Sequence, residues 1–179
     1  MYLFTSERLG FRQWQASDLP TFAAMNGDAE VMRFFPAVLS VEESGALAER
    51  IMKGIEQYGY GFFAVDRLEE SDFIGFIGLI NTTFETYFTP CVEIGWRLKK
   101  EVWNKGYATE GAKKCLAYGF ETLKLDKIYS FTPLPNLPSE SVMQKIGMEK
   151  AGTFEHPRIE NGHFLKTHVL YKTLNFTLL

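Results

Sequence analysis

The chain has 179 residues, of which 46% are hydrophobic and 15% aromatic, enough for one sizeable core and too many for a disordered chain. Its 22 acidic and 19 basic residues are mixed along the sequence and give a formal net charge of −3, which argues against a nucleic-acid-binding surface. No apolar run reaches the roughly 18 residues of a membrane span. We therefore expect a cytoplasmic protein that contacts neither membranes nor nucleic acid.

Two cysteines, Cys91 and Cys115, are too few for a disulfide framework, and their spacing does not match a zinc site. We interpret both as buried thiols. The histidines His156, His163 and His168 fall within 13 positions, but neither carboxylates nor cysteines accompany them at ligand spacing. The sequence therefore predicts no metal site.

The first elements are a strand and a short helix. Leu9 and Phe11 alternate with Arg and Gly neighbours, which is the period of a half-buried strand. Asp18 then stands where an N-cap is expected, before a helix over residues 19–25.

Two further caps predict the next helices. Asp28 indicates a second helix over residues 29–35, which Pro36 would end. Ser40 and Glu43 have the spacing of a capping box, and apolar residues follow at helical intervals. This pattern predicts a longer helix after residue 40.

Beyond residue 60 strands dominate, with helices between some of them. The predicted strands are 62–66, 73–80, 92–98, 127–132, 149–154 and 164–174. Ala108, Ala112 and Leu116 mark one helical stripe, and residues 139–146 form a short helix that Gly147 stops. This order predicts a mixed α/β fold with a partly antiparallel sheet, in a single domain over residues 1–179.

A short loop, Asn104-Lys105-Gly106-Tyr107-Ala108-Thr109, joins the strand 92–98 to the following helix. Backbone N–H groups at a helix start have no intrahelical partners and carry the positive end of the helix dipole, so they can bind an anion. Gly106 lets a ligand approach closely, and Lys105 adds a cation. A pyrophosphate suits such a site, although a lone glycine before a helix is often only a turn.

Four stretches of the sequence, in the right order, resemble the GNAT acyltransferases, in particular the RimJ/RimL-like branch. They are TSERLGFRQWQASDLPTFAAMNGDAEVMRFF (5–35), IGWRLKKEVWNKGYATEGAKKCLAYGF (94–120), NLPSESVMQKIGMEKAGTF (136–154) and HPRIENGHFLKTHVLY (156–171). The resemblance implies an α+β acyl-CoA N-acyltransferase fold. Its central twisted sheet of about seven, mostly antiparallel strands would carry helices on both faces.

The resemblance also implies how acetyl-CoA, the acyl donor, is bound. The backbone amides of Asn104, Lys105, Gly106, Tyr107, Ala108 and Thr109 would hold the pyrophosphate. The backbone of Arg97, Leu98 and Lys99 would pair with the pantetheine arm. Trp103 stands where the wider superfamily has Gln or Arg, a change of little consequence if the phosphate contacts come from the backbone.

For acetyl transfer to an amine, Glu93 is the first candidate for the general base, unless it is only a strand carboxylate paired with a Lys or Arg. By resemblance, Asn136 would bind a pantetheine amide, and Ser139 would donate a proton to the leaving thiolate. Asn136 can equally act as an N-cap. Tyr171 is a second possible proton donor, although an aromatic residue in a closing strand is usually part of the core.

The sequence thus predicts direct transfer of acetyl to a primary amine, either a protein N-terminal α-amine or a small molecule. A non-catalytic CoA- or peptide-binding module on the same fold is the first alternative, and an unrelated phosphate-binding scaffold is the second. The closing strands also offer an exposed edge for a homodimer, which the sequence does not decide.

Overall fold

The structure is a computed structural model, and it describes residues 1–175; residues 176–179 of the predicted domain lie outside that range. The helices are α1 (Leu19–Gly27), α2 (Val41–Tyr58), α3 (Tyr107–Ala117) and α4 (Leu137–Lys145). The strands are β1 (Phe4–Thr5), β2 (Leu9–Arg12), β3 (Phe62–Arg67), β4 (Asp72–Thr82), β5 (Cys91–Leu98), β6 (Lys127–Pro133), β7 (Glu149–Glu155) and β8 (Thr167–Leu174). A π turn at Tyr118–Thr122 continues α3.

All the described strands form one sheet of eight, in the order β1-β2-β3-β4-β5-β6-β8-β7. Every neighbouring pair is antiparallel except β5 and β6, which run parallel with α3 between them in the chain. The predicted mixed, mostly antiparallel sheet is therefore confirmed. The additional strand is β1, whose two residues are too few to show a period.

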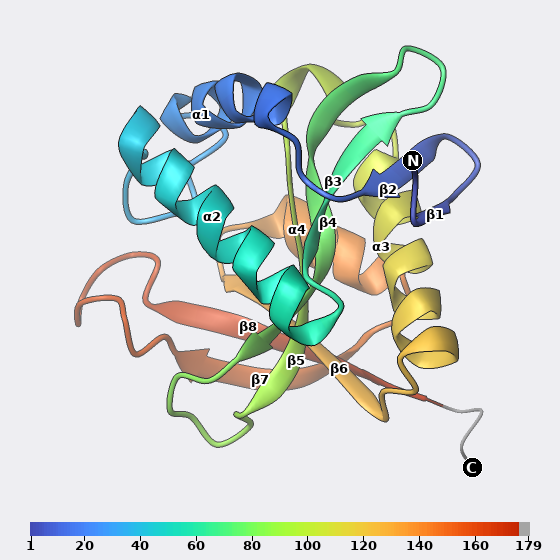
Figure 1. Ribbon diagram of the computed structural model, residues 1–179. Coiled ribbons are helices and arrows are strands. Elements are labelled where there is room, and N and C mark those ends of the chain that lie inside the picture. Colours follow the sequence, from blue (N-terminus) through green and yellow to red (C-terminus); the bar gives the residue numbers. More distant parts are fainter. Residues whose placement is uncertain (176–179) are drawn as a thin grey trace.

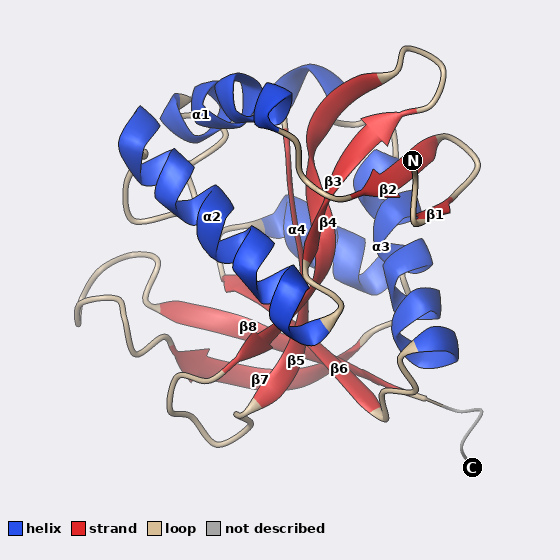
Figure 2. Ribbon diagram, in the orientation of Figure 1, coloured by secondary structure: helices blue, strands red, loops and turns tan. Residues whose placement is uncertain are grey.

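Helices cover both faces of the sheet (Figures 1 and 2). Successive residues of a strand point to opposite faces, and β4 shows which helices lie on each. Phe76 contacts Phe22 of α1, with ring centroids 6.0 Å apart, whereas Ile77 packs directly under Gly111 of α3. We call these the α1 face and the α3 face. α2 packs with α1, and α4 packs with α3.

The capping box predicted for α2 is confirmed. The Glu43 N–H donates to Ser40 Oγ (3.1 Å), and the Ser40 N–H donates to Glu43 Oε2 (2.8 Å). Gly59, in the left-handed region with φ 75°, ends the helix. None of the helices in residues 1–175, α2 included, is long and apolar enough to cross a bilayer.

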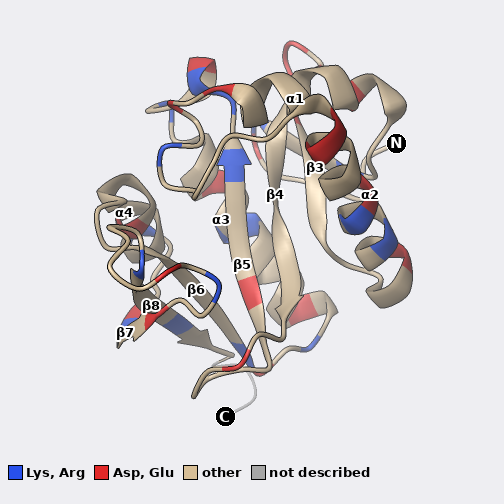
Figure 3. Ribbon diagram, turned by 90° about the vertical axis from the view of Figure 1, so that its left-hand side faces the viewer, with Lys and Arg blue, Asp and Glu red and all other residues tan. Residues whose placement is uncertain are grey.

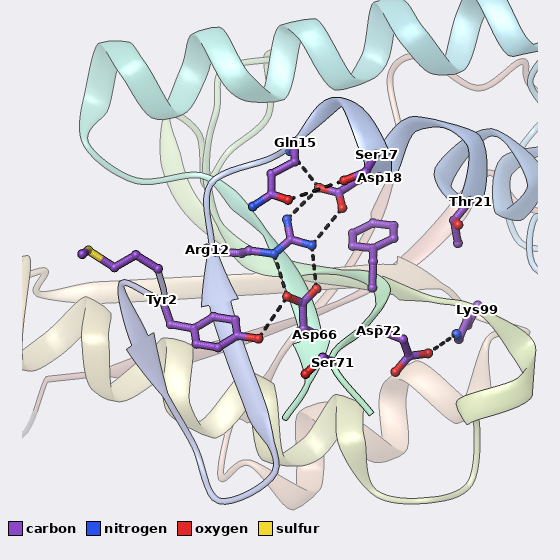
Figure 4. A pocket seen from close by; sticks show the side chains of 12 residues that line it. Tyr2, Arg12, Gln15, Ser17, Asp18, Thr21, Asp66, Ser71, Asp72 and Lys99 are labelled. Carbon is purple, nitrogen blue, oxygen red and sulfur yellow. Dashed lines mark hydrogen bonds and ion pairs between the residues drawn. The ribbon is translucent and has the colours of Figure 1, made fainter. Parts of the chain in front are cut away.

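Asp18 stands at the N-cap position of α1 as predicted, but its side chain does not cap the helix. Its carboxylate makes no cap bond to α1 and instead accepts from Arg12 Nη1 (2.7 Å) and Nη2 (2.8 Å). Arg12 also binds Asp66, so one buried guanidinium lies between two buried carboxylates (Figure 4). A buried cation needs such partners, and this requirement outweighs the helix cap.

The helix predicted over residues 29–35 is wrong, because residues 29–34 form turns and residue 35 a bend. Asp28 does cap the first turn, accepting from the Glu30 N–H (2.8 Å) and the Val31 N–H (3.3 Å). Pro36 follows too soon for a regular helix, since it disfavours helical backbone at the residue before it and a short helix cannot offset its nucleation cost.

Gly78 lies at the centre of the sheet, where it pairs with Phe62 of β3 and with Gly95 of β5. A Cβ atom at Gly78 would overlap the backbone carbonyl oxygen of Gly61. Backbone cannot yield as the end of a side chain can, so the centre of the sheet requires glycine at this position.

Gly78→Ala should lower the free energy of unfolding by about 3 kcal/mol, because the added methyl group forces β3 and β4 apart. Gly45→Ala is the matched control: it lies in α2 with open space around it, and it should be neutral or stabilise the protein by about 0.5 to 1 kcal/mol. Urea denaturation measures both changes. A Gly78→Ala protein as stable as the wild type would contradict the close approach.

Candidate active site

A cleft opens where β5 and β6 separate. The two strands share a single bridge, between Glu93 and Tyr129, and Ser130 Oγ donates to the Ile94 carbonyl just beyond it (3.0 Å). Further along, no described residue of β6 pairs with β5, and the two strands spread apart in Figure 3. The cleft encloses about 810 Å³ and runs along β5 past the starts of α3 and α4.

The start of α3 presents a row of unpaired backbone amides to this cleft. Within residues 1–175, none of the N–H groups from Asn104 to Thr109 donates a hydrogen bond. Asn104 (φ 59°) and Gly106 (φ 83°) turn the chain through the left-handed region, which Asn and Gly tolerate best. Successive N–H groups beside such residues form a concave anion site, which the helix dipole strengthens.

Arg8 holds this loop in place from the start of the neighbouring strand β2. Its Nη1 donates to the Lys105 carbonyl (3.1 Å), and its Nε pairs with Glu110 Oε2 (2.6 Å) in the first turn of α3. The guanidinium also lies 4.5 Å from the centre of the Tyr107 ring. These contacts fix the loop without using its amides. Lys105 contributes backbone here, and its side chain does not line the cleft.

The open edge of β5 brings some of the predicted residues to the cleft and leaves one outside. Arg97 and Leu98 line it, and the Leu98 carbonyl accepts from Trp103 Nε1 (2.8 Å). The Lys99 N–H donates to the Ile74 carbonyl (2.9 Å), and its ammonium pairs with a carboxylate of β4. Lys99 therefore lies outside the cleft, with its N–H already engaged.

Glu93 is the carboxylate at the end of the cleft where β5 and β6 meet. Its Oε2 accepts from Thr82 Oγ1 (2.6 Å), and it forms no ion pair within residues 1–175. Burial raises the pKa of Glu93 to about 7. The hydrogen bond from Thr82 favours the ionised form and lowers the pKa, but its effect is smaller than that of burial. Glu93 is thus not half of a surface ion pair, and it titrates where a general base is most useful.

Asn136 and Ser139 line the cleft from the start of α4. Asn136 is the N-cap, with a long bond of 3.4 Å from the Ser139 N–H to its Oδ1. Its Nδ2 donates to Thr132 Oγ1 (2.8 Å) and to Ser139 Oγ (3.1 Å). The cap leaves a lone pair on Asn136 Oδ1 and the hydroxyl proton of Ser139 available to a ligand.

Tyr171 is buried away from the cleft, with 3% of its surface exposed. Its hydroxyl donates to Glu140 Oε1 (2.9 Å) and accepts from Gln144 Nε2 (3.1 Å), both on α4. Tyr171 is therefore a packing residue with satisfied hydrogen bonds, whereas Ser139 lines the cleft. Among the described residues, no three His, Cys, Asp or Glu side chains are grouped to hold a metal ion.

The prediction of two buried thiols holds for Cys115 only, because Cys91, at the start of β5, is partly buried. Cys115 lies in the core, and burial raises its pKa above the ordinary value. Burial likewise raises the pKa of Cys91 to about 12. Neither thiol forms a reactive thiolate near neutral pH.

The chain is similar to several acetyltransferases. An uncharacterised N-acetyltransferase of Bacillus subtilis, YnaD, is 33% identical over 152 residues, which cover 84% of this chain and 85% of that protein. The crystal structure of a GNAT-family acetyltransferase from Bacillus anthracis is 29% identical, with a TM-score of 0.79 and coverage of 96% of this chain and 97% of that chain.

The crystal structure of spermidine N-acetyltransferase from Vibrio cholerae, in complex with CoA and spermine, is also similar. At its level of identity, this similarity shows only that the two proteins share a fold. It has 23% identity, a TM-score of 0.74 and coverage of 94% of this chain and 96% of that chain. The family model described as "Acetyltransferase (GNAT) domain" matches residues 8–149. The chain therefore belongs to the GNAT acetyltransferase family.

Proposed function

We propose that this acetyltransferase takes its acetyl group from acetyl-CoA and transfers it directly to a primary amine while both substrates are bound. The observation that carries the proposal is the row of unpaired N–H groups from Asn104 to Thr109, in a cleft that also contains Glu93. Adjacent donors at a helix start suit a diphosphate, because they hold several of its oxygens at once.

The chain holds acetyl-CoA mainly through its backbone. The amides of Asn104 to Thr109 bind the pyrophosphate, and the open edge of β5 at Arg97 and Leu98 faces the pantetheine arm in place of the absent strand neighbour. Asn136 Oδ1 accepts from a pantetheine amide. These roles agree with those expected from the resemblance, except that Lys99 contributes no N–H.

The reaction removes two protons from the acceptor ammonium. Glu93, directly or through a water, takes the first and returns it to solvent. The amine nitrogen then bonds to the thioester carbonyl carbon and the C–S bond breaks. The second proton reaches the leaving thiolate through the Ser139 hydroxyl. A backbone N–H near Arg97 stabilises the oxyanion of the tetrahedral intermediate. The products are the N-acetylated amine and CoA.

Direct transfer is favoured over an acyl-enzyme because neither cysteine lines the cleft and the pKa of each thiol is raised. The acceptor is a protein N-terminal α-amine or a small-molecule amine. The RimJ/RimL-like motifs favour an α-amine, whose pKa of about 7.7 to 8.0 needs less help from a base than the pKa of about 10.4 of a lysine amine.

The direct test incubates the protein with acetyl-CoA and a panel of peptides and small amines. We expect release of CoA together with a mass gain of one acetyl group on some acceptors. Acetyl-CoA binding without release on any acceptor would favour a non-catalytic module, and failure to bind acetyl-CoA would overturn the proposal.

Gly106→Asp should abolish acetyl-CoA binding, because it places a carboxylate beside the pyrophosphate. Gly59→Asp is the matched control, since Gly59 has a similar φ (75° against 83°) and lies at the end of α2, outside the cleft. Calorimetry should show loss of binding in Gly106→Asp only. Equal losses in both variants would mean that backbone strain, and not charge, is responsible.

Glu93→Gln should lower kcat by about 10²- to 10⁴-fold with an amine of pKa near 10, and leave acetyl-CoA affinity unchanged. In the wild type, activity should rise with pH as Glu93 loses its proton near pH 7, and Gln should remove that rise. Thr82→Val should move the midpoint to higher pH, because the Thr82 hydrogen bond lowers the pKa of Glu93. An unaltered pH profile in Glu93→Gln would exclude Glu93 as the base.

A further inference from the structure

The Arg97 side chain lies on the opposite face of the sheet from the start of α3. It pairs across the sheet with Phe76, and Glu93 pairs with Ile80 four residues further along β4, so Arg97 and Glu93 both project from the α1 face. The amide row belongs to the start of α3, on the opposite face. One ligand on the α1 side of the cleft can therefore contact both Arg97 and Glu93.

Part of the Arg97 guanidinium has no partner. Nη1 donates to Asn26 Oδ1 of α1 (2.6 Å), and the guanidinium carbon lies 4.1 Å from the centre of the Phe35 ring. Nε is buried without an acceptor, and within residues 1–175 Nη2 makes no hydrogen bond and no carboxylate pairs with the side chain. Burial lowers the pKa of Arg97 to about 10. A buried, unpaired donor is costly unless a ligand satisfies it.

In two other arginines of the protein, the edge of the guanidinium formed by Nε and Nη2 binds a carboxylate. Arg12 uses Nε and Nη2 to hold both oxygens of Asp66, each at 2.6 Å (Figure 4). Arg67 holds Asp72 in the same way, at 2.7 and 2.9 Å. The Nε and Nη2 edge fits a carboxylate because its two N–H groups are parallel. In Arg97 this edge has no carboxylate from the described chain.

The geometry points to a specificity role, which rests on the proposed function: we propose that Arg97 binds a carboxylate carried by the acceptor amine. Asn26 orients the guanidinium from its far side, and Glu93 serves the amine of the same molecule. Acceptors of this class are amino acids and peptides with a nearby carboxylate.

The other charges of the cleft agree with an acceptor that carries an anion. The cleft is lined by more cations than anions: the cations are Arg33, Arg97, Lys145 and Arg158, and the anions are Glu30 and Glu93. Glu30 is exposed and lies 4.0 Å from Lys100. A polyamine would meet repulsion here, with Glu93 as its main attraction.

Phe35 is the side chain that can give way to such a ligand. Its ring covers the guanidinium, yet 39% of its surface is exposed, and it lies in the turn region before α2 rather than in a regular element. A carboxylate that reaches Nε therefore displaces an exposed ring and leaves the core intact.

The test compares acceptors in matched pairs, each amino acid or short peptide with its own carboxamide, by kcat/KM and by calorimetric affinity in the presence of CoA. Wild type should prefer the acids by about 10- to 100-fold. Arg97→Gln should remove this preference, and Arg97→Lys should retain a part of it through charge alone. Arg33→Gln removes the same charge from the same cleft and should leave most of the preference intact.

Equal use of acids and amides by the wild type, or an undiminished preference in Arg97→Gln, would overturn the inference. So would an equal loss of preference in Arg33→Gln, which would indicate general charge attraction, or a loss of acetyl-CoA affinity in Arg97→Gln. Failure of every acceptor to be acetylated would instead refute the proposed function, and the calorimetric comparison would still test whether Arg97 recognises a carboxylate.

Discussion

Strand pairing that stops early is the feature on which this site depends. β5 and β6 meet at Glu93 and Tyr129 and then separate. A parallel pair that continued would satisfy the β5 edge with backbone hydrogen bonds and close the cleft. On its other side β5 pairs with β4 along the whole length of β5, up to the pair of Gly75 and Leu98. This pairing keeps β5 extended where it no longer pairs with β6. An extended ligand can then take the place of the absent strand.

The two faces of β5 carry different chemistry. On the α3 face the chain offers backbone donors, and on the α1 face it places Glu93 and Arg97, two ionisable groups without ion-pair partners in the described chain. The raised pKa of Glu93 makes the folded state bind its proton more tightly than the unfolded state. Stability from this source is complete below the ordinary pKa near 4.5 and is lost as the pH rises to about 7. Ionised Glu93 thus lowers the stability of the fold at neutral pH, where it can act as a base.

Local patterns in the sequence were enough to predict most elements and the loop at the start of α3. Asn104 and Gly106 are residue types that accept left-handed backbone, and the capping box of Ser40 identifies α2. Contacts between distant residues could not be predicted in this way. The Arg8 contact with Glu110 spans 102 positions, and Asp18 looks like a cap until Arg12 is seen to bind it. The unpaired edge of Arg97 could not be predicted from neighbouring residues either, because it depends on the absence of a carboxylate from distant parts of the described chain.

A crystal structure of the protein with acetyl-CoA bound tests the central claim most directly. The account predicts pyrophosphate oxygens within hydrogen-bond distance of the Asn104 to Thr109 amides, and the pantetheine arm between β5 and β6 with Glu93 near the acetyl group. Cofactor bound elsewhere, or a pyrophosphate held by side chains with these amides facing water, would contradict it.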